Sequence, residues 1–339
     1  HRASRPAFRQ SSNIGRMLNA FWLMAKRLTF IARSPTYDIV VLGTDPQFAY
    51  FMLPFARLLK RRSKLVYWAF DLYPEAVAAN DMGLCSKLVS LSKPLTRFCY
   101  SRLDGIVDIG PCMRRLLDKY EPRGSRATLV PWALFEPHSP PEPDPKTRRE
   151  LFGDAKLTLL YSGNIGKAHA FECFIALARE LRRRGASVAF CFAGRGYRYE
   201  QIRSLVSEAD TNISFAGFAS DGQLAKRLGA GDIHMISLRE GWEGIVVPSK
   251  FFGALAMGKP LLYEGTPKSC IREWISEEGI GFYITENNIQ EIADKLEALA
   301  LNSTALAQFK KNAFDLYRQR FSKQVVMDGW NDFLNELVK

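Results

Sequence analysis

The stretch that decides the fold is "LLYSGNIGKAH" at residues 159–169. An apolar run, residues 157–161, indicates a buried strand, and the glycine-bearing turn after it predicts a helix that opens at Ala170. A helix N-terminus presents unpaired amide donors, and small residues before it let a diphosphate approach the backbone. Lys167 and His169 would add positive charge at the same place. A plain tight turn between strand and helix is the alternative interpretation.

The rest of the second half repeats this rhythm of strand and helix. Helical patterns separate the strand candidates and then continue to the end of the chain, over 289–301, 305–319 and 323–337. Because connections of this length join parallel strands, the half is predicted to be a doubly wound α/β sheet. The further strand candidates are residues 188–193, 213–215, 233–237, 260–263 and 281–284.

The first half begins with an amphipathic helical pattern over residues 13–33 and then alternates in the same way. We therefore expect two Rossmann-like domains, 1–140 and 141–320, with a final helix, 321–339, packing back on the first. The polar opening leads straight into a helix, and one interpretation is that the first βαβ unit of this domain is missing. The strand candidates are residues 38–43, 65–70, 105–109 and 128–130, and the Pro-rich segment 136–145 is the expected linker.

The charge of the chain is concentrated in its first half. Residues 1–150 hold 24 Lys and Arg against 13 Asp and Glu, whereas the remaining residues hold 23 against 22. In the helix 13–33 basic residues alternate with large apolar ones, a pattern that favours an anionic membrane surface over nucleic acid. The alternative is that this helix packs on the sheet of its own domain. No apolar run approaches the ~20 residues of a membrane-spanning helix.

The six cysteines form no CxxC pair and no regular framework. We expect them to be buried as small apolar residues in a reducing compartment, which predicts a cytoplasmic protein, peripheral on the inner face of the cell membrane. They are Cys85, Cys99, Cys112, Cys173, Cys191 and Cys270.

Three more glycine-bearing turns follow predicted strands. Gly194 and Arg195 follow the second strand of the half, and Gly217 and Phe218 follow the third, where backbone and ring could contact a nucleobase. The segment 239–250, "REGWEGIVVPSK", combines two glycines, two carboxylates, a Pro-Ser helix start and a lysine. A hydroxyl cap would leave amide donors exposed there, and the lysine could direct its charge at a phosphate.

The runs "LYSGNIGKAHAFE", "FCFAGRG", "ISFAGF" and "GIVVPSKFFGALAMGKPLLY" resemble, in order and spacing, the donor domain of family-4 glycosyltransferases. They are most similar to bacterial exopolysaccharide and lipid-linked oligosaccharide members with a Pro-Ser-Lys motif. In the first half "VYWAFDLYPEAV" and "LVPWA" are similar to further segments of that family. The resemblance implies a GT-B fold, in which two Rossmann-like domains face each other across a cleft.

The resemblance also implies roles for individual residues. It assigns the donor diphosphate to the first glycine turn and to the Pro-Ser-Lys turn, the base to the third glycine turn, and the acceptor to Asp71 with Glu75. Glu243 and Gly244 would face the donor sugar, and Glu243, Asp71 and Lys250 would be the catalytic group. The implied binding set is Gly163, Asn164, Gly166, His169, Gly194, Arg195, Gly217, Phe218, Gly244, Ser249 and Lys250.

The chain departs from the family pattern at its charged positions. Gly253 and Ile245 occupy the places of two glutamates that many members carry, and Asn164 and His169 occupy those of the usual Arg and Lys. The sequence therefore resembles a divergent branch in which Lys250 and His169 neutralise the phosphates.

The resemblance implies a retaining, metal-independent hexosyltransferase without cofactor. Its donor would be a nucleotide-sugar, with UDP-sugars favoured, and its acceptor a lipid-linked or polysaccharide glycan of the bacterial cell surface. A catalytically inactive partner subunit and a nucleotide-sugar 2-epimerase remain alternatives. A nicotinamide dehydrogenase is disfavoured, because no GxGxxG follows a strand with an acidic residue ~20 positions further on.

Overall fold

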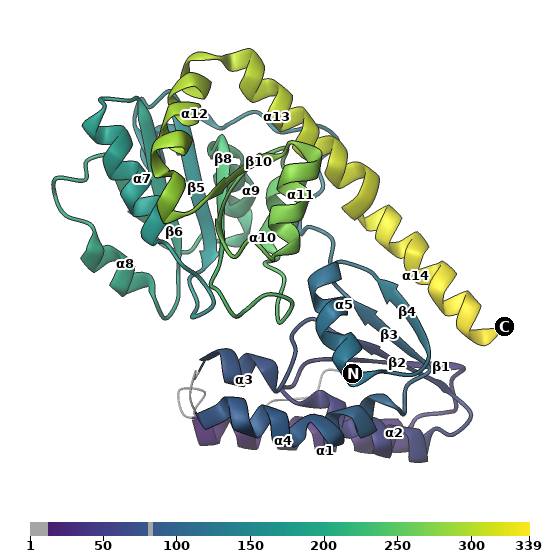
Figure 1. The fold of residues 1–339 in the computed structure, drawn as a ribbon. Coiled ribbons are helices and arrows are strands. Elements are labelled where there is room, and N and C mark those ends of the chain that lie inside the picture. The colour runs from purple at the N-terminus through teal and green to yellow at the C-terminus, as the bar shows by residue number, and fades with distance from the viewer. Residues whose placement is uncertain (1–12, 81–83) are drawn as a thin grey trace. The chain divides into compact units, whose positions relative to one another are not determined.

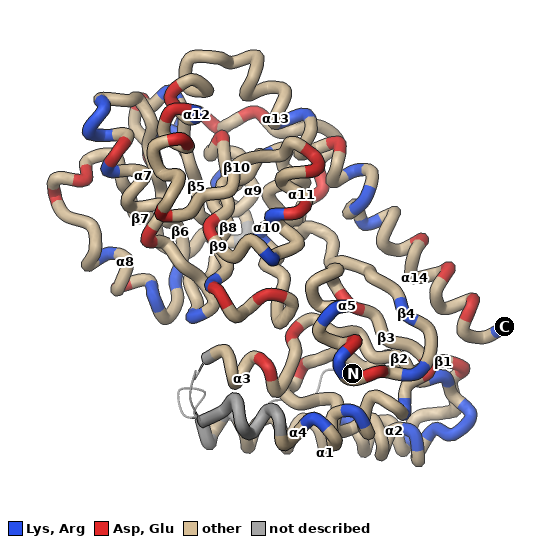
Figure 2. The backbone as a smooth tube through the Cα atoms, viewed as in Figure 1, with Lys and Arg blue, Asp and Glu red and all other residues tan. Residues whose placement is uncertain are grey.

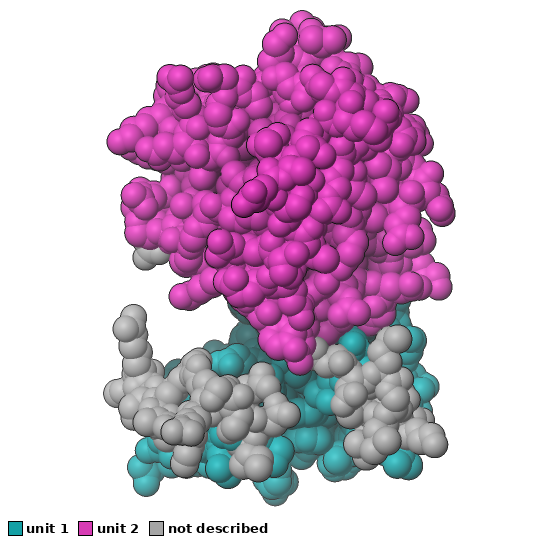
Figure 3. All heavy atoms as spheres, turned by 90° about the vertical axis from the view of Figure 1, so that its left-hand side faces the viewer, with its two compact units in different colours: residues 1–130, 244–247, 327–339 teal, residues 131–243, 248–326 magenta. Residues whose placement is uncertain are grey.

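The computed structural model describes residues 13–80 and 84–339, which form two compact units, coloured separately in Figure 3. Unit 1 comprises the described residues up to Val130, together with Gly244–Val247 and Met327–Lys339, and unit 2 comprises Pro131–Glu243 and Pro248–Val326. The expected domain boundary after residue 140 lies inside unit 2. The polar opening, residues 1–12, and the side chain of Cys85 lie outside the described part.

Unit 1 is built on a parallel sheet whose strand order follows the chain, β1-β2-β3-β4. Tyr67 and Trp68 are neighbours on β2, so their side chains point to opposite faces. Tyr67 packs on Tyr100 of α4 (ring centroids 5.7 Å apart), and Trp68 packs on Trp330 of α14 (4.9 Å). Helices therefore cover both faces of the sheet (Figure 1).

The strands of unit 1 are β1 (Ile39–Gly43), β2 (Lys64–Trp68), β3 (Gly105–Asp108) and β4 (Ser125–Thr128). Its helices are α1 (Asn13–Arg33), η1 (Ala49–Met52), α2 (Leu53–Leu59), α3 (Glu75–Asn80), α4 (Leu84–Tyr100), α5 (Pro111–Leu117), η2 (Asp118–Tyr120) and most of α14 (Lys323–Val338).

Unit 2 is a six-stranded parallel sheet of order β10-β9-β8-β5-β6-β7. The order reverses between β5 and β8, as in doubly wound nucleotide-binding folds. The strands are β5 (Leu157–Asn164), β6 (Val188–Arg195), β7 (Ile213–Ala216), β8 (Ile233–Leu238), β9 (Leu261–Gly265) and β10 (Gly281–Ile284). The helices are α6 (Pro145–Phe152), α7 (Glu172–Arg183), α8 (Tyr199–Leu205), α9 (Asp221–Ala230), α10 (Lys250–Ala256), α11 (Cys270–Glu278), η3 (Glu286–Asn288), α12 (Ile289–Leu301), α13 (Ser303–Leu316) and η4 (Tyr317–Phe321).

Alternating side chains of the strands divide the core of unit 2 into two layers. On one face Leu159 and Tyr161 pack with Phe174 of α7 and Leu296 of α12. On the other face Leu160 packs with residues of α6 and the end of α9. Both layers are fully buried, which explains the unbroken apolar runs in these strands.

The ends of the predicted strands lie within three residues of the observed ends. The segment 128–130 overlaps least, because it shares only Thr128 with β4: the Leu129 amide still donates to the Asp108 carbonyl, but Pro131 has no amide proton with which to continue the ladder. The helix expected at 13–33 is confirmed as α1, and that at 289–301 as α12. The five cysteines whose side chains are described are buried, as expected, and no disulfide joins any two of them. In the described part of the chain no helix has the length and apolarity needed to cross a bilayer.

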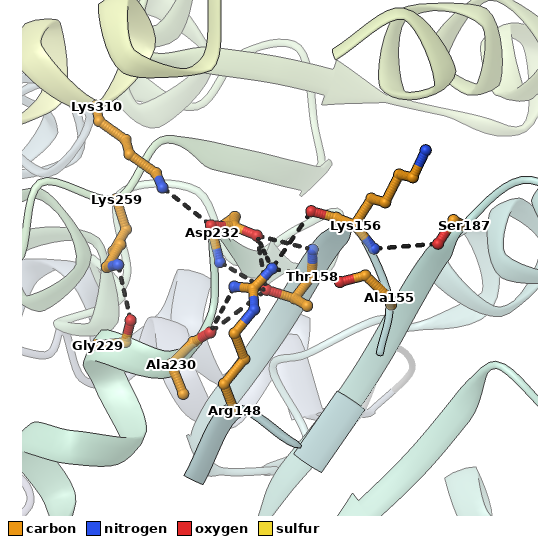
Figure 4. Close-up of polar contacts among 10 residues, drawn as sticks. All are labelled: Arg148, Ala155, Lys156, Thr158, Ser187, Gly229, Ala230, Asp232, Lys259 and Lys310. Atoms are coloured by element: carbon orange, nitrogen blue, oxygen red, sulfur yellow. Dashed lines mark hydrogen bonds and ion pairs between the residues drawn. The ribbon is translucent and has the colours of Figure 1, made fainter. Parts of the chain in front are cut away.

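A buried ion-pair network joins β5 and β8 where both strands begin (Figure 4). Asp232, just before β8, is 4% exposed and accepts from Arg148 of α6 (2.8 Å), Lys310 of α13 (2.9 Å) and the Thr158 amide (3.2 Å). Burial alone would raise the pKa of Asp232, but the hydrogen bond from Arg148 and the positive charge of Lys310 lower it overall. Asp232 therefore fixes two helices and two strands at one point.

Replacing Asp232 by Asn should destabilise the protein by about 2–4 kcal/mol, because Arg148 and Lys310 would lose their carboxylate while still partly buried. Urea unfolding followed by circular dichroism measures this. The control is Asp315→Asn, which removes an exposed pair with Lys311 and should cost less than about 1 kcal/mol. Equal costs for the two variants would contradict the role given to Asp232.

Candidate functional site

The strands of unit 2 separate at the reversal of strand order. β5 pairs with β6 from Leu157 to Asn164, but it pairs with β8 only at Leu159 and Leu160. Beyond Leu160 the carboxyl-terminal part of β5 has no partner on that side. Ligands of doubly wound sheets bind in the crevice that such a separation leaves.

A cavity of about 310 Å³ occupies this place within unit 2. Its walls come from the ends of β5 and β6, the middle of β8, helices α9 and α10, and the segment 132–135. The lining is mostly apolar, with a few polar side chains among it. Small-molecule sites in proteins have this composition. Of the predicted residues, Gly163, Gly194, Phe218, Ser249 and Lys250 line the cavity.

Gly163 makes room for Lys250. It has φ of 134°, and a Cβ placed on it would lie 2.7 Å from the Lys250 Cε. A side chain at position 163 would therefore push the lysine out of its place. At Gly194 the close neighbour is backbone, because a Cβ built on this residue would lie 1.9 Å from the Gly163 carbonyl oxygen. Both glycines of the predicted diphosphate turns thus have a steric reason to be glycine.

Lys250 is a largely buried cation. Its Nζ lies 5.2 Å from the centroid of the Tyr161 ring, and burial lowers its pKa from 10.5 to about 8. Within residues 13–80 and 84–339 no carboxylate forms an ion pair with it. A positive charge held in a cavity without a counter-ion favours binding of an anion there.

Asn164, Gly166, Arg195 and Gly217 lie beside the cavity rather than in its wall. The guanidinium of Arg195 stacks over the Phe218 ring at 4.4 Å, and Phe218 is 55% exposed. The Gly217 carbonyl accepts from Arg227, whose side chain does line the cavity. An arginine and an aromatic ring therefore border the cavity next to α9.

The expectation that His169 carries positive charge is wrong. Its Nδ1 lies 2.8 Å from the Ser237 carbonyl oxygen, which can only accept, so Nδ1 carries the hydrogen. Burial, and then the nearby charge of Lys250, lower its pKa to about 4. The ring is therefore neutral at pH 7, and its Nε2 is an acceptor.

The helix after the first glycine turn also differs from the prediction. It begins at Glu172 rather than at Ala170, and its first amides are already used. The Phe171 amide donates to Oε2 of Glu172 (2.8 Å), and the Cys173 amide donates to Oε1 of Glu264 (3.1 Å). The terminus of α7 is therefore occupied by the protein's own carboxylates.

The predicted hydroxyl cap of the Pro-Ser-Lys turn is absent. Ser249 is the N-cap residue of α10, but its side chain accepts no amide hydrogen bond, because its backbone is already helical with φ of −59°. Pro248 precedes the cap and accepts from the Phe251 amide through its carbonyl (3.0 Å). The turn thus contributes Lys250 rather than a capped helix end.

The three remaining predicted residues lie outside the cavity wall. Glu243 belongs to unit 2, in the loop after β8. Gly244 belongs to unit 1, where a Cβ would lie 2.4 Å from the Cys112 carbonyl oxygen, so it packs on backbone. Asp71 lines a separate hollow of unit 1, and burial, followed by the charge of Asp45, raises its pKa.

Glu264, at the end of β9, is a buried carboxylate that sequence reasoning missed. It is 6% exposed, and among the described residues its Oε2 has no hydrogen-bond partner. Burial raises its pKa from 4.5 to about 7, although the Cys173 amide opposes that shift. The carboxylate in "PLLYEG" directly after an apolar strand was the only signal in the sequence.

His234 and the segment 132–135 were also missed. His234 stands in the middle of a buried strand, where the sequence suggests only packing, and Trp132 and Phe135 fall between the predicted strands and the linker. They meet in the cavity through contacts between segments about 100 residues apart. Periodicity along the chain cannot reveal such contacts.

The two parallel sheets, with a lysine-bearing cavity at the strand reversal of the second, define a GT-B protein with two Rossmann-like domains. The chain belongs to the family described as "Glycosyl transferases group 1", which matches residues 144–315.

The relatives agree with this family. WbjE of Pseudomonas aeruginosa, named as a probable glycosyltransferase, is 27% identical over 300 residues, covering 86% of this chain and 74% of its own. WcaI of Escherichia coli K12, named as a colanic acid biosynthesis glycosyl transferase, is 25% identical over 64% of this chain and 55% of its own length. The chain thus spans only about half of WcaI. The solved structure of Anabaena HepE with UDP and glucose has a TM-score of 0.68 at 15% identity, over 98% of this chain and 84% of HepE, and shows the shared fold.

Glu264 gives the stability of unit 2 a predictable pH dependence. Because its pKa is raised in the folded state, the fold binds more protons than the unfolded chain between pH 4.5 and about 7, so stability falls as pH rises through that window. Glu264→Gln mimics the protonated acid. It should match the wild type at pH 4.5 and exceed it by about 1–3 kcal/mol at pH 8.

Thermal unfolding at both pH values tests this, with the exposed Glu277→Gln of α11 as the control. A Glu264→Gln variant that is less stable than the wild type at pH 8 would show that the carboxylate is needed in its charged form.

Proposed function

We propose that this protein transfers a sugar, from a nucleotide-sugar donor bound in the cavity of unit 2, to a lipid-linked or polysaccharide acceptor in bacterial cell-surface glycan synthesis. The observation that carries the proposal is Lys250, a largely buried cation without an ion-pair partner among the described residues, in a mostly apolar cavity at the strand reversal. UDP-sugars are favoured as donors. This choice is supported by HepE, whose structure contains UDP and glucose, and the glycan acceptor is supported by WcaI, which is named for colanic acid biosynthesis.

The donor diphosphate is assigned to the carboxyl end of β5. There Lys250 would pair with phosphate oxygens, and Gly163 leaves the space in which the lysine side chain lies. Binding of an anion would raise the depressed pKa of Lys250, so the ammonium form would be favoured in the complex. The base and ribose would fill the apolar part between α9, α10 and the segment 132–135.

The chemical step is the departure of the nucleoside diphosphate. As the bond from the anomeric carbon to the phosphate oxygen breaks, positive charge develops on the sugar ring and negative charge on the leaving group. A preorganised ammonium group such as Lys250 stabilises the second charge without reorganisation. We assign this role to Lys250, expect no metal ion to be required, and propose a retaining hexosyl transfer with Glu243 facing the sugar.

Unit 1 is the proposed acceptor domain. Its hollow of about 740 Å³ is lined by Asp71 and Asp45, by Arg27, and by apolar residues that include Phe30. A carboxyl group with a raised pKa, such as Asp71, could exchange a proton with an acceptor hydroxyl. The mixed lining would suit a sugar linked to an apolar carrier.

We further propose that unit 1 lies on an anionic membrane surface. One face of α1 packs into the unit through Leu23 and Ile31, while Met17, Phe21 and Phe30 on that helix are more than half exposed. Helices α1 and α2 contact each other, as do α2 and α4, and these neighbours expose large apolar side chains too. Lys and Arg recur along the helices of unit 1, as Figure 2 shows.

A catalytically inactive partner subunit is the second candidate. The observation that favours it is Gly253, which lines the cavity where many related enzymes carry a glutamate, and a Cβ there would meet nothing within 4 Å. Such a subunit would bind the nucleotide without transferring or hydrolysing its sugar.

Lys250→Met should lower turnover at least about tenfold and weaken UDP binding, because the phosphate charge loses its counter-ion. The unliganded variant should be no less stable than the wild type, since a buried charge is removed. Radiolabelled sugar transfer to a membrane extract and UDP thermal shifts measure the two effects. Lys226→Met, which changes an exposed lysine of α9, is the control.

Full activity of Lys250→Met would exclude the proposed role of this lysine. UDP binding by the wild type without any sugar transfer would favour the inactive subunit.

The membrane proposal predicts sedimentation with vesicles that contain phosphatidylglycerol, and not with pure phosphatidylcholine. Raising the salt above physiological ionic strength, where the Debye length falls below ~8 Å, should release a large part of the protein. Phe21→Ser should weaken the residual, salt-resistant binding. Equal binding to both kinds of vesicle would contradict an anionic partner.

A further inference from the structure

His234 is a buried polar side chain that the proposed transfer chemistry does not use. It is 3% exposed and lies on β8, on the sheet face opposite to Met235, which joins the main core. Its side chain lines the cavity together with Arg227 and Leu228 of α9. His234 pairs with Leu160 of β5. Leu160 precedes Gly163 by three residues on that strand, which is a distance of about 10 Å. This separation suits a ligand whose phosphates lie at Gly163 and whose base lies further inside.

The protonation of His234 follows from its hydrogen bond. Its Nε2 lies 2.9 Å from the Leu228 carbonyl oxygen, which can only accept, so Nε2 carries a hydrogen. Burial lowers the pKa of the ring to about 4, and the ring is therefore neutral at pH 7. Nδ1 then bears a lone pair. Within residues 13–80 and 84–339 no donor is hydrogen-bonded to that nitrogen.

When a ligand fills the cavity and excludes water, an acceptor that is left without a donor is costly, so a ligand that supplies the donor is favoured over one that does not. Uracil, thymine and guanine carry a ring N–H on their pairing edge. Cytosine and adenine present a ring nitrogen with a lone pair at the corresponding position. Cytosine and adenine would therefore place a ring lone pair against the lone pair of Nδ1, with no hydrogen between the two acceptors.

We propose that Nδ1 of His234 reads the nucleobase of the donor by accepting a hydrogen bond from its ring N–H, so that the cavity selects uracil, thymine or guanine against cytosine and adenine. This inference rests on the proposed function, because it needs a nucleoside diphosphate in the cavity.

UDP and CDP form a matched pair of probes, because they have nearly the same shape and differ on the pairing edge. Calorimetric titration of the full chain at pH 7.5 should show UDP binding at least about tenfold more tightly than CDP. Two variants separate ligand recognition from packing. In His234→Gln the amide nitrogen can replace Nε2 and keep the bond to Leu228, but the Nδ1 acceptor is lost. In His234→Asn the amide oxygen can replace Nδ1, but the bond to Leu228 is lost.

The expected result is that His234→Gln retains its thermal stability while the ratio of UDP to CDP affinity falls toward one. His234→Asn should lose stability and keep most of the ratio. An unchanged ratio in His234→Gln, or equal binding of UDP and CDP by the wild type, would overturn the inference. If one of these two results is found while Lys250→Met still abolishes UDP binding, the role of His234 is excluded but the proposed function is not. If no nucleoside diphosphate binds the wild type, or if binding does not depend on Lys250, the proposed function fails with it.

Discussion

The structure of unit 2 depends on the short pairing of β5 with β8. Asp232 holds the two strands together where they begin, through bonds to α6, α13 and the Thr158 amide. After Leu160 the pairing with β8 ends, and β5 pairs only with β6 as far as Asn164. Two parallel strands that are tied at one end and free at the other must leave a crevice at the free end. The cavity, Gly163 and Lys250 all lie there.

Buried charge is compensated at one end of these two strands and uncompensated at the other. At the tied end each oxygen of Asp232 meets a cation, so the charge is compensated and the network serves stability. At the free end Lys250 has no carboxylate partner among the residues that the structure describes, and burial keeps His169 neutral. His234, at the last pair of the β5–β8 ladder, is also kept neutral by burial. An uncompensated cation among neutral acceptors is a poor arrangement for stability alone. It is a suitable one for a ligand that has an anionic part and a part with hydrogen-bond donors.

Much of the fold could be predicted because its signals are local. The strand before Ser162, the glycine turn after it and the amphipathic pattern of α12 each extend over a single window of sequence. The sequence also pointed to Gly163 and Lys250, which line the cavity, because a glycine turn after a buried strand and a lysine at a helix start are typical of phosphate-binding turns. The hydrogen bond between the Glu264 carboxylate and the Cys173 amide of α7 could not be predicted, because these two residues lie 91 positions apart along the chain. The neutral state of His169 likewise depends on burial and on the charge of Lys250, which lies 81 residues further along the chain.

The absence of a side chain at Gly253 has a chemical consequence for donor recognition. A Cβ at this position would meet no atom within 4 Å, so packing does not require glycine there. For the proposed nucleotide-sugar donor, the lack of a carboxylate at that point of α10 would leave the ribose hydroxyls one acceptor fewer than a glutamate there would provide. Selectivity would then have to come from other groups of the cavity wall, namely the ring nitrogen of His234, the guanidinium of Arg227 and the aromatic surface of Trp132. A site of this kind derives affinity from apolar contact and from Lys250, and discrimination from the edge of the base rather than from the sugar attached to it.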